Sequence, residues 1–252
     1  MVAKRIIPCL DVNCGRTVKG VNFDNMIDIG SPIDMARAYS QQGADELLFL
    51  DINATKDNSN IFYKIIEEIA CNINIPFTVG GGVRSVDDVA RLLDSGADKV
   101  AINSAAIYNP NLVNKVSSRF GNQILVIAID AKKLDDRQVV FSAGASKACE
   151  KELLEWSVEV QDRGAGEILY TSIDCDGMVN GYDLENLKIL NDRLRIPLIA
   201  SGGAGSMDHF LELFRLDCSS AALAASVFHK EVIKIKELKS YLFKNSIDIR
   251  LC

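Results

Sequence analysis

Residues 76–82 read PFTVGGG, and residues 197–203 read PLIASGG, 121 positions later. Three further pairs of stretches repeat at offsets of 119 to 122 residues: IIPCLDV (6–12) with LVIAIDA (125–131), GADELLFLD (43–51) with GAGEILYTS (164–172), and KVAINS (99–104) with AALAAS (221–226). Repetition on this scale indicates that one structural unit occurs twice in the chain. The sequence therefore predicts two similar halves, approximately residues 1–122 and 123–252.

Short apolar, β-branched runs alternate with longer amphipathic segments along the chain. The predicted strands are residues 5–11, 46–52, 77–80, 99–103, 124–130, 167–173, 198–201 and 221–226. The predicted helices lie near residues 31–42, 60–74, 85–95, 109–119, 151–164, 183–194, 206–215 and 232–244. Apolar strands separated by helices are typical of parallel strands buried on both faces. Eight such units in two similar halves predict a single-domain α/β fold, the (βα)8 TIM barrel, built from two half-barrels. The alternative is an open doubly wound sheet, whose usual GxGxxG after the first strand is missing.

Composition and charge narrow the class of protein. The 252 residues include 48% hydrophobic and 25% charged residues, which is ordinary for a globular domain. A net charge of −6 and the lack of a basic stripe argue against non-specific nucleic-acid binding. The opening MVAKRIIPCLDV has too short an apolar stretch for a signal peptide, and no run approaches transmembrane length. We therefore expect a cytoplasmic protein that binds neither nucleic acid nor a membrane.

The cysteines and histidines give no sign of a metal site. The seven cysteines are scattered and include no CxxC pair, which favours reduced thiols: Cys9, Cys14, Cys71, Cys149, Cys175, Cys218 and Cys252. His209 and His229 are the two imidazoles of the sequence. Without clustered ligands, we expect no zinc site.

Two carboxylates end strands that occupy equivalent places in the two halves. Asp11 ends the first predicted strand, and Asp130 ends the fifth, which lies opposite it in an eight-stranded barrel. Catalytic groups of such barrels sit at the carboxyl ends of the strands. Two carboxylates that face one cavity from opposite sides suit general acid–base catalysis. The alternative is that each Asp caps the N-terminus of a helix or makes a hydrogen bond within a loop. This alternative explains less well why both Asp residues occupy equivalent positions in the two halves.

Each half also carries a glycine turn followed by a strand that ends near a serine. The turns are Gly80-Gly81-Gly82 and Gly202-Gly203, and the later strand ends are Asn103-Ser104 and Ala225-Ser226. Glycine lets the backbone approach an anion, and N–H groups at the start of a following helix bind phosphate. A lone glycine turn is weak support for such a site, but two equivalent copies predict a substrate with two phosphates.

Charged residues occur at the opposite ends of four predicted strands. Arg5, Glu46, Lys99 and Glu167 begin the first, second, fourth and sixth strands. A barrel axis is normally filled with apolar side chains, so charges at several strand starts are unusual. We expect these two cations and two anions to ring the amino-terminal mouth in mutual salt bridges and to form a gated opening. The alternative is a set of surface ion pairs beside the helices.

Two of the loops that follow strands are long. Residues 12–30 follow the first strand, and residues 131–150 follow the fifth. The second loop contains QVVFSAG, which predicts a small hairpin. Long loops at the catalytic face of a barrel usually cover the active site.

By these residues the chain resembles the cyclase-subunit family of imidazole glycerol phosphate synthase, an enzyme of histidine biosynthesis. The resemblance runs through AKRIIPCLDV, VKGVNF, TVGGGVRS, GADKVAIN, GAGEILYTSID, ASGGAG and LAASVFH. It implies a linear ribulosyl nucleotide with a phosphate at each end as the substrate. Ammonia from a glutaminase partner, docked on the amino-terminal face, would pass through the barrel to close an imidazole ring. An aminoimidazole carboxamide ribotide would be released as the second product. No metal or organic cofactor is implied.

The resemblance also implies roles for individual residues. Asp11 and Asp130 match the catalytic pair, Lys19 matches a substrate-contacting lysine on the first loop, and Asp98 matches a residue near the partner's active site. The remaining matches are one phosphate site (Gly82, Asn103, Ser104), the other phosphate site (Asp176, Gly177, Gly203, Ser226) and the ammonia gate (Arg5, Glu46, Lys99, Glu167).

The departures from the family pattern lie mainly on the catalytic face. After the sixth strand, Cys175 and Met178 stand where the family usually has Arg and Thr, and residues 144–150 differ from the usual glycine- and lysine-rich stretch. Ser104 replaces a commoner Thr, and LDCSS (216–220) replaces Gly-Ala-Asp. Two alternatives therefore remain: a paralogue that delivers ammonia for amidation of a surface sugar, and the sugar isomerase of the histidine pathway.

Overall fold

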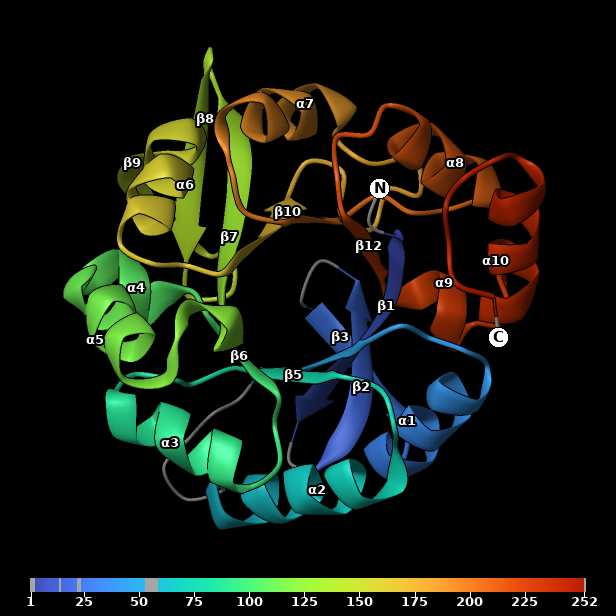
Figure 1. Cartoon of the computed structure of the whole chain (residues 1–252), viewed down its shortest axis with the longest axis horizontal. Coiled ribbons are helices and arrows are strands. Elements are labelled where there is room, and N and C mark those ends of the chain that lie inside the picture. The colour runs from blue at the N-terminus through green and yellow to red at the C-terminus, as the bar shows by residue number, and fades with distance from the viewer. Residues whose placement is uncertain (1–2, 14, 22–23, 53–58, 252) are drawn as a thin grey trace.

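A closed ring of parallel strands forms the centre of the computed structural model, which describes residues 3–13, 15–21, 24–52 and 59–251 (Figure 1). The ring consists, in order, of β1 (Arg5–Asn13), β4 (Leu47–Asp51), β5 (Phe77–Gly80), β6 (Lys99–Ile102), β7 (Leu125–Leu134), β10 (Glu167–Ser172), β11 (Leu198–Ser201) and β12 (Ala221–Ala224). Strand β10 pairs with β7, and β12 pairs with β1, so the sheet closes on itself. The predicted (βα)8 barrel is therefore confirmed, and the open sheet is excluded.

Helices surround this ring on the outside (Figure 1). They are α1 (Pro32–Gln41), α2 (Ser59–Asn72), α3 (Val86–Asp94), α4 (Ser104–Tyr108), α5 (Asn111–Phe120), α6 (Leu153–Asp162), α7 (Leu184–Arg193), α8 (Met207–Arg215), α9 (Ser226–His229) and α10 (Ile235–Lys244), with a 3₁₀ turn at Asn122–Ile124. The main apolar core lies between strands and helices and includes Phe49, Trp156 and Phe210, all almost fully buried. No helix within the described ranges is long and apolar enough to cross a membrane.

Side-chain caps explain where several helices begin. Ser31 accepts the N–H of Asp34 at the start of α1, which also has Pro32 in its first turn. Ser85 and Asp88 form a reciprocal capping box at the start of α3. Such caps satisfy amide groups that have no partner inside the helix, and each typically stabilises it by about 1 kcal/mol. They fix α3 directly behind the first glycine turn.

The backbone repeats between the halves as closely as the sequence does. Gly81 has φ 95° and its equivalent Gly202 has φ 91°. Ser85 and Ser206, which begin α3 and α8, have φ/ψ of −143°/164° and −141°/165°. The first glycine of each turn and the residue before each following helix therefore have nearly the same backbone conformation in both halves.

A second apolar cluster fills the inside of the barrel. It consists of Ile7, Cys9, Leu48, Ala101, Val126, Leu169, Ile199, Ala221 and Leu223, all buried. Several of these side chains are small, and they come from strands on all sides of the ring. The interior between the two mouths is therefore lined by hydrocarbon, as is usual for this fold.

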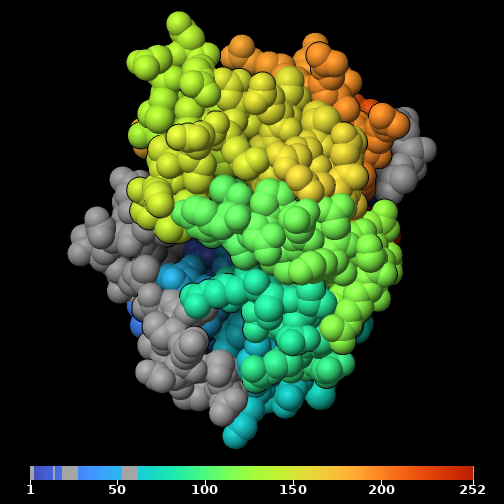
Figure 2. Space-filling model, turned by 90° about the vertical axis from the view of Figure 1, so that its left-hand side faces the viewer, coloured from blue at the N-terminus to red at the C-terminus, as the bar shows by residue number. Residues whose placement is uncertain are grey.

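Two hairpins extend the sheet beyond the ring. Strand β7 pairs antiparallel with β8 (Arg137–Ser142), which pairs with β9 (Lys147–Glu152), so the hairpin expected from QVVFSAG is confirmed. This hairpin projects from the barrel wall (Figure 1, Figure 2). The other hairpin, β2 (Arg16–Val21) with β3 (Asp24–Gly30), occupies the long loop after β1 and was not predicted.

The cysteines that the structure describes form no disulfide. Cys14 and Cys252 lie outside the described residues.

Candidate active site

A cavity of about 910 Å³ opens at the carboxyl ends of the barrel strands. Its lining comes from both halves and includes Asp11, Asp51, Gly82, Arg84, Asn103, Ser104, Asp130, Thr171, Asp176, Gly177, Gly203 and Ser226. Figure 2 shows the molecule hollowed between its yellow-green and teal segments, with blue atoms of the N-terminal region visible inside. The volume lies within the range of small-molecule sites.

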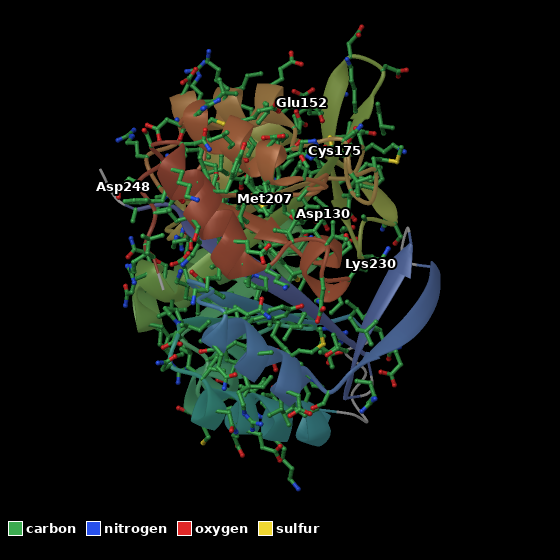
Figure 3. The ribbon with its side chains drawn as sticks, turned by 90° about the vertical axis from the view of Figure 1, so that its right-hand side faces the viewer. Asp130, Glu152, Cys175, Met207, Lys230 and Asp248 are labelled. Carbon is green, nitrogen blue, oxygen red and sulfur yellow. The ribbon has the colours of Figure 1, made fainter. Side chains whose placement is uncertain are left out.

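Asp130 is a carboxyl group of this cavity with a strongly raised pKa. Burial raises its pKa to about 6, and the nearby Asp176 carboxylate acts in the same direction. Hydrogen bonds from Asn103 and Thr171 oppose the rise, and the Asn103 Nδ2–Asp130 Oδ2 distance is 2.8 Å. In Figure 3, Asp130 lies toward the side from which the hairpins project, whereas Asp248 lies on the opposite side. A carboxyl group with a pKa near the working pH is suited to proton transfer.

Asp11 faces the same cavity from β1, the strand opposite β7. The Cys9 thiol, two residues earlier on that strand, lies 3.7 Å from Asp11 Oδ1. The structure thus brings the two predicted catalytic residues to one cavity, at equivalent strand ends.

The first predicted phosphate site surrounds the turn after β5. Gly81 has φ 95°, and a Cβ there would lie 2.1 Å from the carbonyl oxygen of Asp51, so glycine is required. The next residue, Gly82, has φ 64° and is exposed. Asn103 and Ser104 lie at the start of the short helix α4, beside this turn in the cavity wall.

The second predicted phosphate site has the same plan at β11 and β12. Gly203 has φ 99°, and a Cβ there would lie 1.9 Å from the carbonyl oxygen of Gly181. Ser226 begins the short helix α9, and Asp176 and Gly177 join the cavity from the turn after β10. All residues expected at the two phosphate sites therefore line one cavity.

The turn between β8 and β9 lies against the first of these sites. The backbone N–H of Ala143 donates to Ser104 Oγ at 2.9 Å, and the hydroxyls of Tyr108 and Ser142 are 2.9 Å apart. Because Ser104 uses a lone pair to accept from Ala143, its own proton remains available for an oxygen of a bound ligand.

Several lining residues were not predicted from the sequence. Asp51 is the last residue of β4, and Thr171 lies near the end of β10. Arg84 follows the first glycine turn. The positions of Asp51 and Thr171 at strand ends were a usable signal, because the same rule selected Asp11 and Asp130. The departures Cys175 and Met178 are not among the described lining residues: Cys175 is half-buried, and Met178 is 60% exposed.

The four charged residues predicted at the amino-terminal mouth form one connected ring. Arg5 Nη1 lies 2.8 Å from Glu46 Oε2, and Arg5 Nη2 contacts Glu167 Oε1. Lys99 Nζ lies 3.0 Å from Glu46 Oε2 and 3.0 Å from Glu167 Oε2. The two carboxylates are 2% and 7% exposed, so the alternative of surface ion pairs is wrong. We call these four residues the charged ring.

Polar neighbours complete the charged ring. The Thr78 hydroxyl donates to Glu46 Oε1 at 2.6 Å, and Arg5 Nη2 donates to Ser220 Oγ at 3.1 Å. Asp98 is exposed at the same end, where its carboxylate accepts the N–H of Phe77 at 2.8 Å. Buried charges are tolerated when both partners and hydrogen bonds are present.

Lys19 lies in the first hairpin, in β2, where its backbone pairs with Ile27 of β3. Its side chain lies outside the described part of the structure, so its predicted contact with substrate remains a prediction. Within the described part, no group of three or more His, Cys, Asp and Glu side chains is arranged to hold a metal ion.

Fold and site together define a (βα)8-barrel enzyme with two carboxylates between two equivalent glycine turns. The family described as "Histidine biosynthesis protein" matches residues 5–234, and the chain belongs to this family. Proteins called "Imidazole glycerol phosphate synthase subunit HisF" are similar over the whole chain. Those of Flavobacterium johnsoniae and Phocaeicola vulgatus are each 53% identical and cover 100% of both chains. That of Bacteroides thetaiotaomicron is 53% identical over 99% of this chain and 100% of its own.

Proposed function

We propose that this chain is a cyclase that uses ammonia to convert a linear ribulosyl nucleotide with two phosphates into imidazole glycerol phosphate. An aminoimidazole carboxamide ribotide is the second product. The observation that carries the proposal is the placement of Asp11 and Asp130 in one cavity, between two equivalent glycine turns. Relatives called subunits of imidazole glycerol phosphate synthase, 53% identical over the full length, support it.

In this proposal, each half of the barrel binds one phosphate of the substrate. One phosphate binds the turn at Gly82 and the hydroxyl of Ser104, and the other binds the turns at Gly177 and Gly203 and the hydroxyl of Ser226. Backbone N–H groups at such turns bind anions without a cationic side chain. Anchoring both ends holds the central part of the substrate across the mouth of the barrel, where the carboxylates face it.

Proton transfers accompany both ammonia addition and ring closure, and the two carboxylates perform them. With a pKa of about 6, Asp130 is largely ionised above neutral pH and is able to accept a proton from the attacking nitrogen. Asp11, on the opposite strand, is placed to exchange a proton with the other side of the substrate.

Ammonia reaches this site, in our proposal, through the barrel from a glutaminase partner on the amino-terminal face. The apolar cluster inside the barrel lies between that face and the cavity, and the charged ring lies at its amino-terminal end. Asp98 lies on this face beside the ring, as a residue that approaches a partner must. The word "subunit" in the names of the relatives supports an assembly of this kind.

The two alternatives have less support. A subunit that only delivers ammonia needs the ring and the interior but neither carboxylates nor anion turns, all of which are present here. The sugar isomerase has no need of a charged ring, and the similar full-length relatives carry the name of the synthase.

The deciding experiment supplies the purified chain with the ribulosyl nucleotide and an ammonium salt at pH 8.5. Ammonium replaces the partner, so loss of substrate measures the cyclase alone. We expect turnover that saturates in both reactants. A folded protein that binds the nucleotide without converting it would contradict the proposal and favour the ammonia-delivery alternative.

A further inference from the structure

Asn103 occupies a position whose equivalent in the other half is Ala225. In the seam between β6 and β7, Ile102 pairs with Ile127, so Asn103 follows directly beside the strand that carries Asp130. In the seam between β12 and β1, Ala224 pairs with Pro8, which places Ala225 in the same relation to Asp11. The two residues have similar backbone angles, with φ/ψ of −118°/−94° for Asn103 and −119°/−71° for Ala225. Asn103 and Ala225 therefore occupy equivalent places in the two halves, and Asn103 alone of the two carries an amide side chain.

The amide of Asn103 has one partner on the protein and one atom without a partner. Its Nδ2 donates to Asp130 Oδ2 at 2.8 Å. A carboxylate only accepts hydrogen bonds, so this contact fixes which way the amide points. The other amide atom, Oδ1, is buried and has no hydrogen-bond partner in the described structure, although the residue lines the cavity. A buried acceptor without a partner is costly, and a ligand that donates an N–H there removes the cost.

A second polar residue flanks Asp130 from the other neighbouring strand. Thr171 pairs with Asp130 in the register of β10 and β7, and its hydroxyl hydrogen-bonds the carboxyl group. At the equivalent place beside Asp11, β4 carries Leu50, a hydrocarbon side chain. Asp130 is therefore flanked by two hydrogen-bonding side chains, at places where Asp11 is flanked by Ala225 and Leu50.

We propose that Asn103 is a positioning residue for Asp130, and that its carbonyl oxygen binds an N–H of the nitrogen that reacts. Its Nδ2 holds Asp130 Oδ2, with help from Thr171, and so turns the remaining lone pairs of the carboxylate toward the substrate. Its Oδ1 and Asp130 then contact the same nitrogen, one as acceptor and the other as base. This inference rests on the proposed cyclase function and changes the expected role of Asn103 from phosphate binding to proton transfer.

The two roles for Asn103 predict different kinetics. A lost phosphate contact raises KM for the nucleotide and leaves kcat nearly unchanged, because the contact is the same in ground and transition states. A lost positioning contact lowers kcat. Because hydrogen bonds to charged groups are the strong ones, we expect kcat of Asn103→Ala to fall tenfold to a hundredfold. The matched control is Ser104→Ala, the adjacent residue in the same cavity, which should raise KM for the nucleotide instead.

Titration of Asp130 tests the same inference without any substrate. Carboxyl-carbon NMR of the complete chain, assigned with Asp130→Asn, should give a pKa of about 6 in the parent protein. Removing a donor to the carboxylate removes a contact that lowers the pKa, so the pKa should rise in Asn103→Ala. Thr171→Val, an isosteric change, should also raise it and serves if Asn103→Ala does not fold. The groups that face Asp130 are Asn103, Thr171 and Asp176, with Asp11 in the same cavity, and Asp176 acts in the opposite sense to the two donors.

Saturation kinetics then show which nitrogen uses the Asn103 carbonyl. An increased KM for ammonium in Asn103→Ala identifies the incoming ammonia, whereas a changed KM for the nucleotide together with a lower kcat identifies an N–H of the substrate. An unchanged Asp130 titration, or a rise in the nucleotide KM at constant kcat, would overturn the inference. A parent chain without cyclase activity would refute the proposed function. The contact between Asn103 and Asp130 would still be testable in that chain, because the titration needs no turnover.

Discussion

Both ends of this barrel carry several charged side chains, but they arrange them differently. At the amino-terminal end, the charged ring pairs two cations with two anions, and Thr78 and Ser220 complete its hydrogen bonds. At the carboxyl-terminal end, four carboxylates line one cavity: Asp11, Asp51, Asp130 and Asp176. Among the described lining residues of that cavity, Arg84 supplies the positive charge.

The comparison distinguishes paired charges, which suit a structural role, from the carboxyl group of Asp130, which suits acid–base chemistry. A buried ion pair with full hydrogen bonding has little tendency to exchange protons, because both partners are stabilised in their charged forms. Asp130 has the opposite setting: burial and a neighbouring carboxylate destabilise its charged form and raise its pKa to about 6. Only the second arrangement suits acid–base catalysis near neutral pH.

The largest effect that follows is on catalysis. We expect Asp130→Asn or Asp11→Asn to lower ammonium-driven turnover by about a hundredfold to ten-thousandfold, because general acid–base groups contribute about 10² to 10⁴ each. Calorimetry should show that both variants still bind the nucleotide, since the two glycine turns proposed to bind its phosphates remain intact. The matched control is Asp98→Asn, a carboxylate at the other end, which should keep its activity. Comparable losses in all three variants would remove the distinction between the ends.

The next effect concerns the stability that the charged ring contributes. Lys99→Met leaves Glu46 and Glu167, which are 2% and 7% exposed, with Arg5 as their remaining cation. Breaking a buried ion network by removing one partner typically costs about 3–5 kcal/mol. We expect urea unfolding to show a loss near the lower end of this range.

A companion variant sharpens the result for the ring. Replacing all four ring residues with Leu or Met should restore most of the stability, because apolar replacement of a whole buried network is often neutral. Such a variant should still turn over the nucleotide with ammonium and should lose glutamine-driven activity with a partner. If the single change is neutral, the ring is not the satisfied network that the geometry describes.

A smaller and opposite effect on stability is expected at Asp130. The folded-state pKa of about 6 lies above the ordinary 3.8, so the fold favours the protonated form. The stability contributed by that form is fully present below pH 3.8, declines as the pH rises toward 6, and is lost above it. At about 1.4 kcal/mol for each pH unit between the two values, the loss is about 3 kcal/mol.

Asp130→Asn removes this penalty. We expect the variant to be more stable than the parent protein by up to about 3 kcal/mol at pH 8 and by much less at pH 4.5. Urea unfolding at the two pH values measures the difference. A variant that is less stable at pH 8 would show that Asp130 is bound more tightly as a carboxylate than its burial implies.

The smallest effect concerns the glycine turns that we propose bind phosphate. Gly203→Ala places a Cβ 1.9 Å from a backbone carbonyl oxygen at φ 99°, and we expect a loss of about 2 kcal/mol together with a higher KM. Gly144→Ala is the control for the steric clash, because Gly144 also has a positive φ, 62°, and lines the same cavity, but an added Cβ there has nothing within 4 Å. Equal behaviour of the two variants in thermal unfolding and kinetics would contradict the assigned role of Gly203.

The sequence predicted the barrel well because its strands are buried on both faces and read as apolar runs. It did not predict the hairpin of residues 16–30, where charged and apolar residues alternate irregularly and the register shifts twice. Helices α4 and α9 were also missed, since five and four residues are too few to show a helical period.

The site was predictable where one residue could be assigned from its place on a strand. Asp11, Asp130 and the glycine turns follow directly from the repeat. The contact between Asn103 and Asp130 does not, because it joins residues 27 apart and depends on a side-chain direction at a strand end. Thr78 and Ser220 were missed at the charged ring for the same reason.

The seam between β12 and β1 matches the seam between β6 and β7 in register, although it joins the two ends of the chain. Ala222 pairs with Ile6 there as Val100 pairs with Leu125 in the other seam. Lys4 and Ile249 also bridge in parallel beside it. The sheet is thus a circle in which no strand is structurally the first. A circular permutant that joins the ends near residues 4 and 249 and opens the chain near residue 122 would keep both seams, with the order of the halves reversed.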